Sequence, residues 1–134
     1  TNQVEDLNLN EVSTNDNSFS ALKKGGDGDD AYYTGLMVRY GVLNNDKVWD
    51  WHRGSFDHPI ESLQYHYEKH KNEVGAKSMT QYLNKADGFR QNLRGAKKVK
   101  VSGETPNTYK YIKSGKYIMI QKDTNLIVSF GTKD

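Results

Sequence analysis

The chain has 134 residues, enough for one ordinary domain or for a smaller domain with an extension. It contains no cysteine, so neither a disulfide nor a thiolate zinc site holds the fold together, and no apolar run approaches the ~18 residues of a membrane span. Residues 1–50 hold four Lys/Arg against nine Asp/Glu, a net charge of −5, whereas residues 51–134 hold fifteen against eight, a net charge of +7. A basic body is typical of a protein that binds a polyanion, although ordinary surface charge is the alternative.

The first fifty residues are predicted to be an acidic leader or linker in front of a domain at residues 51–134. Residues 1–30 are poor in apolar side chains, which is typical of a weakly ordered segment. Residues 31–51 are more apolar, and they fit either a short helix or a strand that docks on the following domain. Their periodicity does not decide between the two.

Two amphipathic helices are predicted next. The first begins near Pro59, because proline tolerates the first turn of a helix, and it ends at Gly75. Its apolar stripe is formed by Leu63, Tyr67, His70 and Val74, which recur at helical spacing. The second helix starts after Ser78 in a capping-box pattern and closes before Gly95.

After Gly95 the apolar pattern changes to a period of two. Four short strands are predicted around residues 99–101, 109–111, 117–119 and 127–129, separated by turn signals at residues 103–107, 114–115 and 123–125. Short strands at this spacing are typical of an antiparallel meander. The predicted fold class is therefore α+β: two helices packed on a four-stranded antiparallel sheet, preceded by the weakly structured leader.

The first helix carries candidate catalytic residues. His66 and His70 are four positions apart, and Lys69 and Glu73 each follow one of them by three positions, so all four share one side of the helix. Cleavage of RNA by transesterification needs a base, an acid and a cation, which histidine and lysine supply without a metal. The alternative is that these histidines are simply packed or solvated. Glu68 stands two positions after His66 rather than one, so the zinc-protease pattern is absent, and no metal or other cofactor is expected.

Two further groups extend the candidate site. The last strand leads into Ser129, Thr132 and Lys133, whose hydroxyl and ammonium groups suit a phosphate. In the preceding hairpin tyrosines alternate with lysines, a pattern that can stack bases and follow phosphates, unless one tyrosine face simply forms the core. The candidate substrate-binding residues of this hairpin are Tyr109, Tyr111, Lys110, Lys113 and Lys116.

The pattern Tyr-His-x-x-Lys-His-x-x-Glu-Val-Gly at residues 65–75, followed by Tyr-Leu-x-x-Ala-x-x-Phe at residues 82–89, resembles the C-terminal nuclease domains of bacterial polymorphic toxins. These are the domains of contact-dependent inhibition and LXG proteins, and the chain is most similar to those with a barnase/EndoU/colicin D-type ribonuclease fold. Colicin D-type nucleases are similar in placing a Lys-His pair before a glycine and a late serine-containing strand before a lysine. No tryptophan follows Ser129, where that type has one, and no arginine is well placed in the strands.

The resemblance implies metal-independent cleavage of tRNA or rRNA that leaves a 2′,3′-cyclic phosphate. It also implies an immunity protein that masks the site, and delivery from the surface of a producing cell, or by secretion, into the cytoplasm of a target cell. The motif carries over to Lys69, His70, Ser129 and Lys133, while the helix-face argument and looser similarity add His66, Glu73 and Thr132. Two alternatives stay open: a non-catalytic RNA-binding module, and a metal-dependent DNase toxin that uses His66 and His70.

Overall fold

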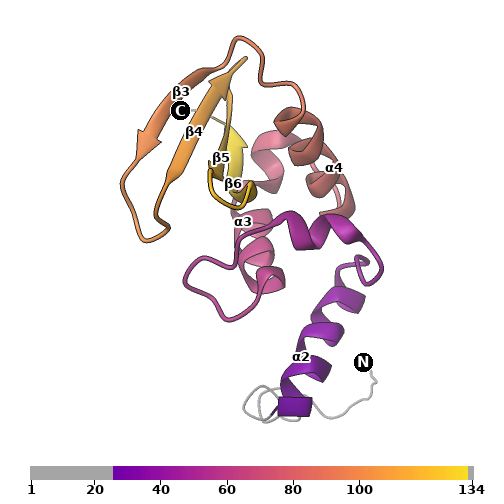
Figure 1. Cartoon of the computed structure of the whole chain (residues 1–134). Coiled ribbons are helices and arrows are strands. Elements are labelled where there is room, and N and C mark those ends of the chain that lie inside the picture. The colour runs from indigo at the N-terminus through magenta and orange to yellow at the C-terminus, as the bar shows by residue number, and fades with distance from the viewer. Residues whose placement is uncertain (1–25, 133–134) are drawn as a thin grey trace. The chain divides into compact units, whose positions relative to one another are not determined.

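The computed structural model describes residues 26–132, in which helices come first and a sheet follows (Figure 1). The elements are α2 (Gly26–Arg39), the short 3₁₀-helix η1 (Asp46–Asp50), α3 (Pro59–Val74), α4 (Met79–Arg90), β3 (Lys97–Val101), β4 (Thr108–Lys113), β5 (Lys116–Gln121) and β6 (Leu126–Thr132). This arrangement confirms the predicted α+β class with four antiparallel strands.

The chain divides into two compact units between Arg39 and Tyr40. In the first unit the structure describes α2, which begins at Gly26, within the segment expected to be weakly ordered; residues 1–25 lie outside the described range. The second unit includes η1, whose Val48 is fully buried. Arg90 at the end of α4 also forms an ion pair with Asp50, at 3.2 Å. Residues 40–50 therefore pack as part of the domain that was expected to begin at residue 51.

The helices begin where local signals predict. Nδ1 of His58 accepts a hydrogen bond from the Ile60 amide at 3.0 Å and caps α3, which ends at Gly75 in the left-handed conformation (φ 71°). In α4, Oγ of Ser78 accepts from the Gln81 amide at 3.1 Å. This helix ends at Arg90, earlier than Gly95, because the Asn92 amide bonds the Phe89 carbonyl in a tighter turn.

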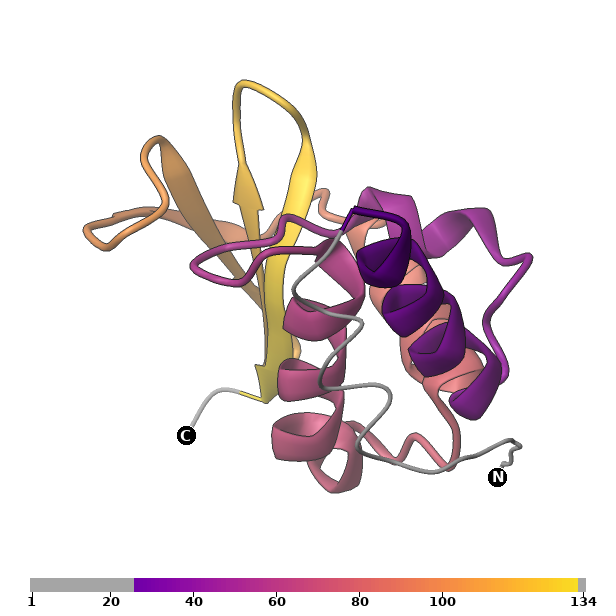
Figure 2. The ribbon, with the colours of Figure 1, turned by 90° about the horizontal axis from the view of Figure 1, so that it is seen from below.

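The four strands form a meander in the order β3-β4-β5-β6, with every neighbouring pair antiparallel. The register between β5 and β6 is irregular: Met119 pairs with Ser129 but Ile120 pairs with Ile127, so Val128 is an extra residue of the kind found in a β-bulge. In Figures 1 and 2, α3 lies along β6, and the β3–β4 hairpin lies on the side of the sheet away from that helix.

The core of the second unit lies between the helices and the last two strands. Tyr82 of α4 donates a hydrogen bond of 2.6 Å to the Phe130 carbonyl of β6, while their rings stand 5.5 Å apart. Trp51 forms an isolated parallel bridge with Ile127, and the neighbouring His52 amide bonds the Ile127 carbonyl at 2.8 Å. The core thus fixes β6 against α4 and against the segment of Trp51 and His52, and β6 carries Ser129 and Thr132 of the candidate site.

Candidate functional site

A chain of hydrogen bonds joins α3 to the sheet. Nδ1 of His70 lies 2.9 Å from Oε1 of Glu73, and Nε2 of His70 lies 3.3 Å from the hydroxyl of Tyr117. That hydroxyl in turn lies 2.8 Å from Oγ of Ser129. His70, Tyr117 and Ser129 are all buried. We call Glu73, His70, Tyr117 and Ser129 the His70 network; three of its four members are residues that the sequence singled out.

Glu73 fixes the orientation of the His70 ring. The backbone amide of Thr132 donates to Oε1 of Glu73 at 3.1 Å and its hydroxyl does so at 3.3 Å. These bonds, led by the Thr132 amide and followed by the His70 contact, hold the pKa of Glu73 below its usual value. The carboxylate is therefore ionised near neutral pH and can only accept, so Nδ1 of His70 carries the proton between them. Nε2 is left to exchange a proton with Tyr117.

The close approach of β6 to α3 depends on a glycine. A Cβ atom on Gly131 would lie 2.7 Å from Nδ1 of His70 and 2.9 Å from Oε1 of Glu73, closer than such atoms come in proteins. Gly131 is also the cross-strand partner of Tyr117. A glycine within a strand often marks such an approach, and it was the available sequence signal for this contact.

His66 stands beside the network, one helical turn before His70. The two rings are parallel within 7°, with centroids 6.0 Å apart, and the His66 ring also lies 5.9 Å from that of Trp51. Nδ1 of His66 is buried and has no hydrogen-bond partner among residues 26–132. Burial, followed by the charges of His70 and Lys69, lowers the pKa of His66 to about 4. His66 is therefore neutral at pH 7.

A groove of about 470 Å³ opens next to His66. Exposed Tyr65 forms part of its wall, and the Tyr65 ring lies 5.8 Å from that of Phe56. Hydroxyl groups are interspersed among apolar side chains, a combination that suits a flat aromatic ligand such as a nucleobase. The lining residues are Gly54, Ser55, Phe56, Ser62, Tyr65, His66, Val101, Gly103, Glu104, Thr105, Thr108, Met119 and Val128.

The groove and the His70 network share one face of the sheet. Met119 lines the groove and is the cross-strand neighbour of both Ser129 on β6 and Lys110 on β4. Side chains paired in this way point to the same face. Lys110 extends along that face, and its Nζ lies 4.8 Å from the centre of the Tyr117 ring. A cation therefore stands beside the network, on the sheet face that also carries Met119 of the groove.

The structure separates other predicted residues. Tyr109 and Tyr111 alternate with Lys110 along β4 and lie on the opposite face of the sheet. Nζ of Lys113 donates to the Asn92 carbonyl at 2.8 Å, and Lys116 pairs with Lys113 at the hairpin turn. Of the five predicted substrate-binding residues, Lys110 is thus the one on the face of the network.

The remaining lysines of the predicted site differ in position. Nζ of Lys69 lies 5.6 Å from the centre of the Tyr65 ring, on the groove side of α3. Lys133 lies outside the described residues. Tyr117 contributes its hydroxyl, but the sequence had placed this tyrosine only in a general Tyr/Lys pattern, because the cross-strand register that brings it to His70 is not readable from one strand.

Comparison with models of known families, with curated proteins and with solved structures found no match. Among residues 26–132, no three His, Asp or Glu side chains are grouped in a way that could hold a metal ion. None of the helices in this range is long and apolar enough to cross a membrane.

Proposed function

We propose that the second unit of this chain is an endoribonuclease that cleaves RNA by metal-independent transesterification. The observation that carries the proposal is the His70 network beside Lys110 and the groove. It combines an oriented imidazole, two hydroxyl groups and a cation on one sheet face. These are the groups that phosphoryl transfer to a neighbouring hydroxyl requires when no metal takes part.

In the proposed reaction the two histidines have opposite roles. Neutral His66 takes the proton of the 2′-hydroxyl, and the 2′-oxygen then attacks phosphorus. The bond from phosphorus to the 5′-oxygen breaks, and protonated His70 supplies a proton to that oxygen through the Tyr117 hydroxyl. Lys110 stabilises the negative charge on the phosphorane. The products are a 2′,3′-cyclic phosphate and a free 5′-hydroxyl.

The biological role we propose is that of a toxin in competition between bacteria. Its supports are the Lys69-His70 motif and the net charge of +7 over residues 51–134, which favours a polyanionic substrate such as tRNA or rRNA. The domain would be secreted, or delivered from a cell surface as part of a larger protein, and would act in the cytoplasm of the target cell. A cognate immunity protein would cover the groove and the exposed ring of Tyr65.

Incubation of the purified protein with total bacterial RNA in EDTA tests this function. We expect discrete tRNA or rRNA fragments with 2′,3′-cyclic phosphate ends, and no cleavage by His70→Ala. Lys85→Ala, an exposed change on α4, is the control and should cleave like the wild type. Intact RNA together with cleavage of DNA after addition of a divalent metal would replace this function by that of a metal-dependent DNase.

One observation favours a second candidate, a non-catalytic RNA-binding module. His70 is 8% exposed, and both of its ring nitrogens have partners within the protein, which also suits a residue that fastens β6 to α3. Under this alternative the wild type binds RNA and leaves it intact, and His70→Ala lowers stability with no effect on any cleavage. End-group analysis of the incubated RNA separates the two candidates.

A further inference from the structure

The face of the sheet opposite the His70 network carries ordered lysines above tyrosine rings. Nζ of Lys98 lies 4.7 Å from the centre of the Tyr109 ring and 5.8 Å from that of Tyr111. Nζ of Lys122 lies 6.0 Å from the Tyr109 ring. The register pairs Lys98 with Tyr111 and Lys100 with Tyr109, so these side chains share one face. We call Lys98, Lys100, Tyr109, Tyr111 and Lys122 the lysine–tyrosine face.

The strands that form this face are strongly basic, and their Lys97 and Lys110 point to the opposite face. Residues 97–122 contain seven lysines and one acidic residue, a net charge of +6. Lys98, Lys100 and Lys122 are all exposed, whereas the tyrosines beneath them are half-buried. A tyrosine ring attracts an ammonium group and limits its motion, so less entropy is lost when that ammonium meets an anion. The rings therefore hold cations in place, and an ammonium group already occupies the position that a stacked base would need.

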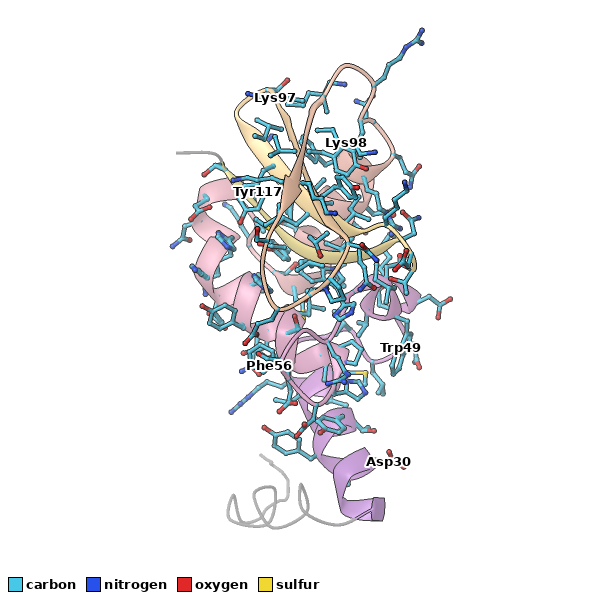
Figure 3. All side chains as sticks on the ribbon, turned by 60° about the vertical axis from the view of Figure 1, so that its left-hand side comes forward. Asp30, Trp49, Phe56, Lys97, Lys98 and Tyr117 are labelled. Carbon is cyan, nitrogen blue, oxygen red and sulfur yellow. The ribbon has the colours of Figure 1, made fainter. Side chains whose placement is uncertain are left out.

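The edge strand β3 connects this face with the other. All but the last of its residues are exposed, so no element within the described part of the second unit covers either side. Lys98 and Lys100 point to the lysine–tyrosine face, and the residues between them point to the face of Lys110 and Tyr117. Figure 3 shows Lys97 and Lys98 at the end of the sheet away from Phe56, which lines the groove. A polyanion that crosses β3 can thus reach both faces.

We propose that the lysine–tyrosine face binds the phosphate backbone of the substrate RNA, independently of base sequence, as a second contact surface apart from the groove. This inference rests on the proposed function for the identity of the polyanion. Contacts to phosphate supply most sequence-independent affinity for nucleic acids and position the substrate, whereas contacts to bases specify it. The groove would then read a base while this face holds the flanking backbone.

The test measures binding of 2′-O-methyl oligouridine and oligoadenosine, which lack the attacking hydroxyl and stay intact. Fluorescence anisotropy is recorded from about 50 to about 200 mM salt, the range in which counterion release is strong. We expect Lys98→Glu/Lys122→Glu to weaken binding of both oligonucleotides by about tenfold or more. The slope of log K against log salt should fall by about 1.4, since two phosphate contacts to a single strand are lost.

The matched control is Lys77→Glu/Lys85→Glu, which changes the net charge equally at two exposed lysines near and on α4. If both double variants bind equally weakly, general charge governs affinity and the proposal is wrong. If the first pair fails to fold by circular dichroism, the neutral pair Lys98→Gln/Lys122→Gln decides in its place. Tyr109→Leu could also lose more affinity than Lys98→Gln, and for only one of the two oligonucleotides. That result would indicate base stacking and would overturn the proposal.

Cleavage assays separate this inference from the proposed function. The groove and the lysine–tyrosine face lie on opposite faces of the sheet, so we expect a dinucleotide in the groove not to reach the second surface. Lys98→Glu/Lys122→Glu should therefore cleave a dinucleotide like the wild type, while its KM for long RNA rises. If the wild-type protein binds RNA and leaves it intact, the proposed ribonuclease function is wrong but the proposed binding surface remains. If Lys98→Glu/Lys122→Glu cleaves long RNA with an unchanged KM, the proposed binding surface is wrong but the ribonuclease function remains.

Discussion

Gly131 of β6 passes His70 of α3 so closely that one added methyl group would lie 2.7 Å from Nδ1 of the imidazole. Gly131→Ala should therefore push the strand and the helix apart and break the contact between His70 and Glu73. We expect a loss of about 1 to 3 kcal/mol in the free energy of unfolding, as in other overpacked sites, together with loss of cleavage. Urea unfolding and the RNA assay measure the two effects.

Gly88 on α4 provides the matched control for that substitution. A Cβ atom there meets nothing within 4 Å, and the residue is exposed within a helix. Gly88→Ala should raise stability by about 0.5 to 1 kcal/mol and leave cleavage unchanged. Equal stability and equal cleavage in the two alanine variants would show that neither depends on the close approach of Gly131 to His70.

Tyr117→Phe keeps the ring and removes the hydroxyl that joins His70 to Ser129. We expect kcat to fall about a hundredfold, the lower range for a lost acid or base, because His70 can no longer pass its proton on. Stability should fall by only about 1 kcal/mol, the usual cost of one buried hydrogen bond. Tyr109→Phe removes a hydroxyl on the opposite face and should retain full kcat for a dinucleotide. A fully active Tyr117→Phe protein would remove this tyrosine from the mechanism.

Thr132→Val separates two roles of Thr132. In the structure its hydroxyl donates to Glu73, so we treat it as a positioning residue for the carboxylate and not as a ligand of phosphate. The variant keeps the backbone amide bond, and we expect a few-fold lower kcat with KM unchanged within about twofold. Steady-state kinetics on a dinucleotide measure both constants. A higher KM with unchanged kcat would instead assign the hydroxyl to substrate binding.

His66 should make the fold sensitive to acid. Its pKa is about 4 in the folded protein and 6.5 in an unfolded chain, so between these values the unfolded state binds the additional proton. The contribution of His66 is complete above pH 6.5 and is lost as the pH falls toward 4. It amounts to at most about 3 kcal/mol, and to less where water reaches the ring.

The measurement is urea unfolding at pH 7.5 and at pH 4.5, with His66→Phe as the comparison. The variant keeps an aromatic ring against Trp51 but cannot be protonated, so its loss of stability in acid should be smaller than that of the wild type. The pKa of His52 is also lowered, by burial and then by Arg53, but that residue is unchanged in both proteins. Equal losses in the two proteins would contradict the low pKa of His66.

The sequence predicted those parts of the site that depend on local spacing. Helical periodicity alone puts His70 and Glu73 on one side of α3, since residues three apart on a helix are neighbours, and the capping residues define where that helix begins and ends. The four strands and their turns also follow from alternation and from turn residues. Ser129 was identified as a late-strand hydroxyl, although its partner was not.

The remaining features depend on register and on long-range packing. Tyr117 reaches Ser129 because β5 and β6 pair Tyr117 with Gly131 and Met119 with Ser129, a register that neither strand encodes alone. The predicted Tyr/Lys group divides between two faces because neighbours in a strand point in opposite directions. The sequence assigned residues 40–50 to the leader because their apolar pattern is short. Their place in the domain depends on long-range contacts, the burial of Val48 and the ion pair between Asp50 and Arg90.

The bond from Thr132 to Glu73 spans 59 positions of the chain. Glu73 and His70 leave the ribosome long before β6 does, and until that strand arrives neither Ser129 nor the Thr132 amide is present to complete the network. A nascent or unfolded polypeptide therefore carries every candidate catalytic side chain of α3 and still lacks an assembled site. Under the proposed ribonuclease function, this order of synthesis would keep the site unassembled until β6 has docked.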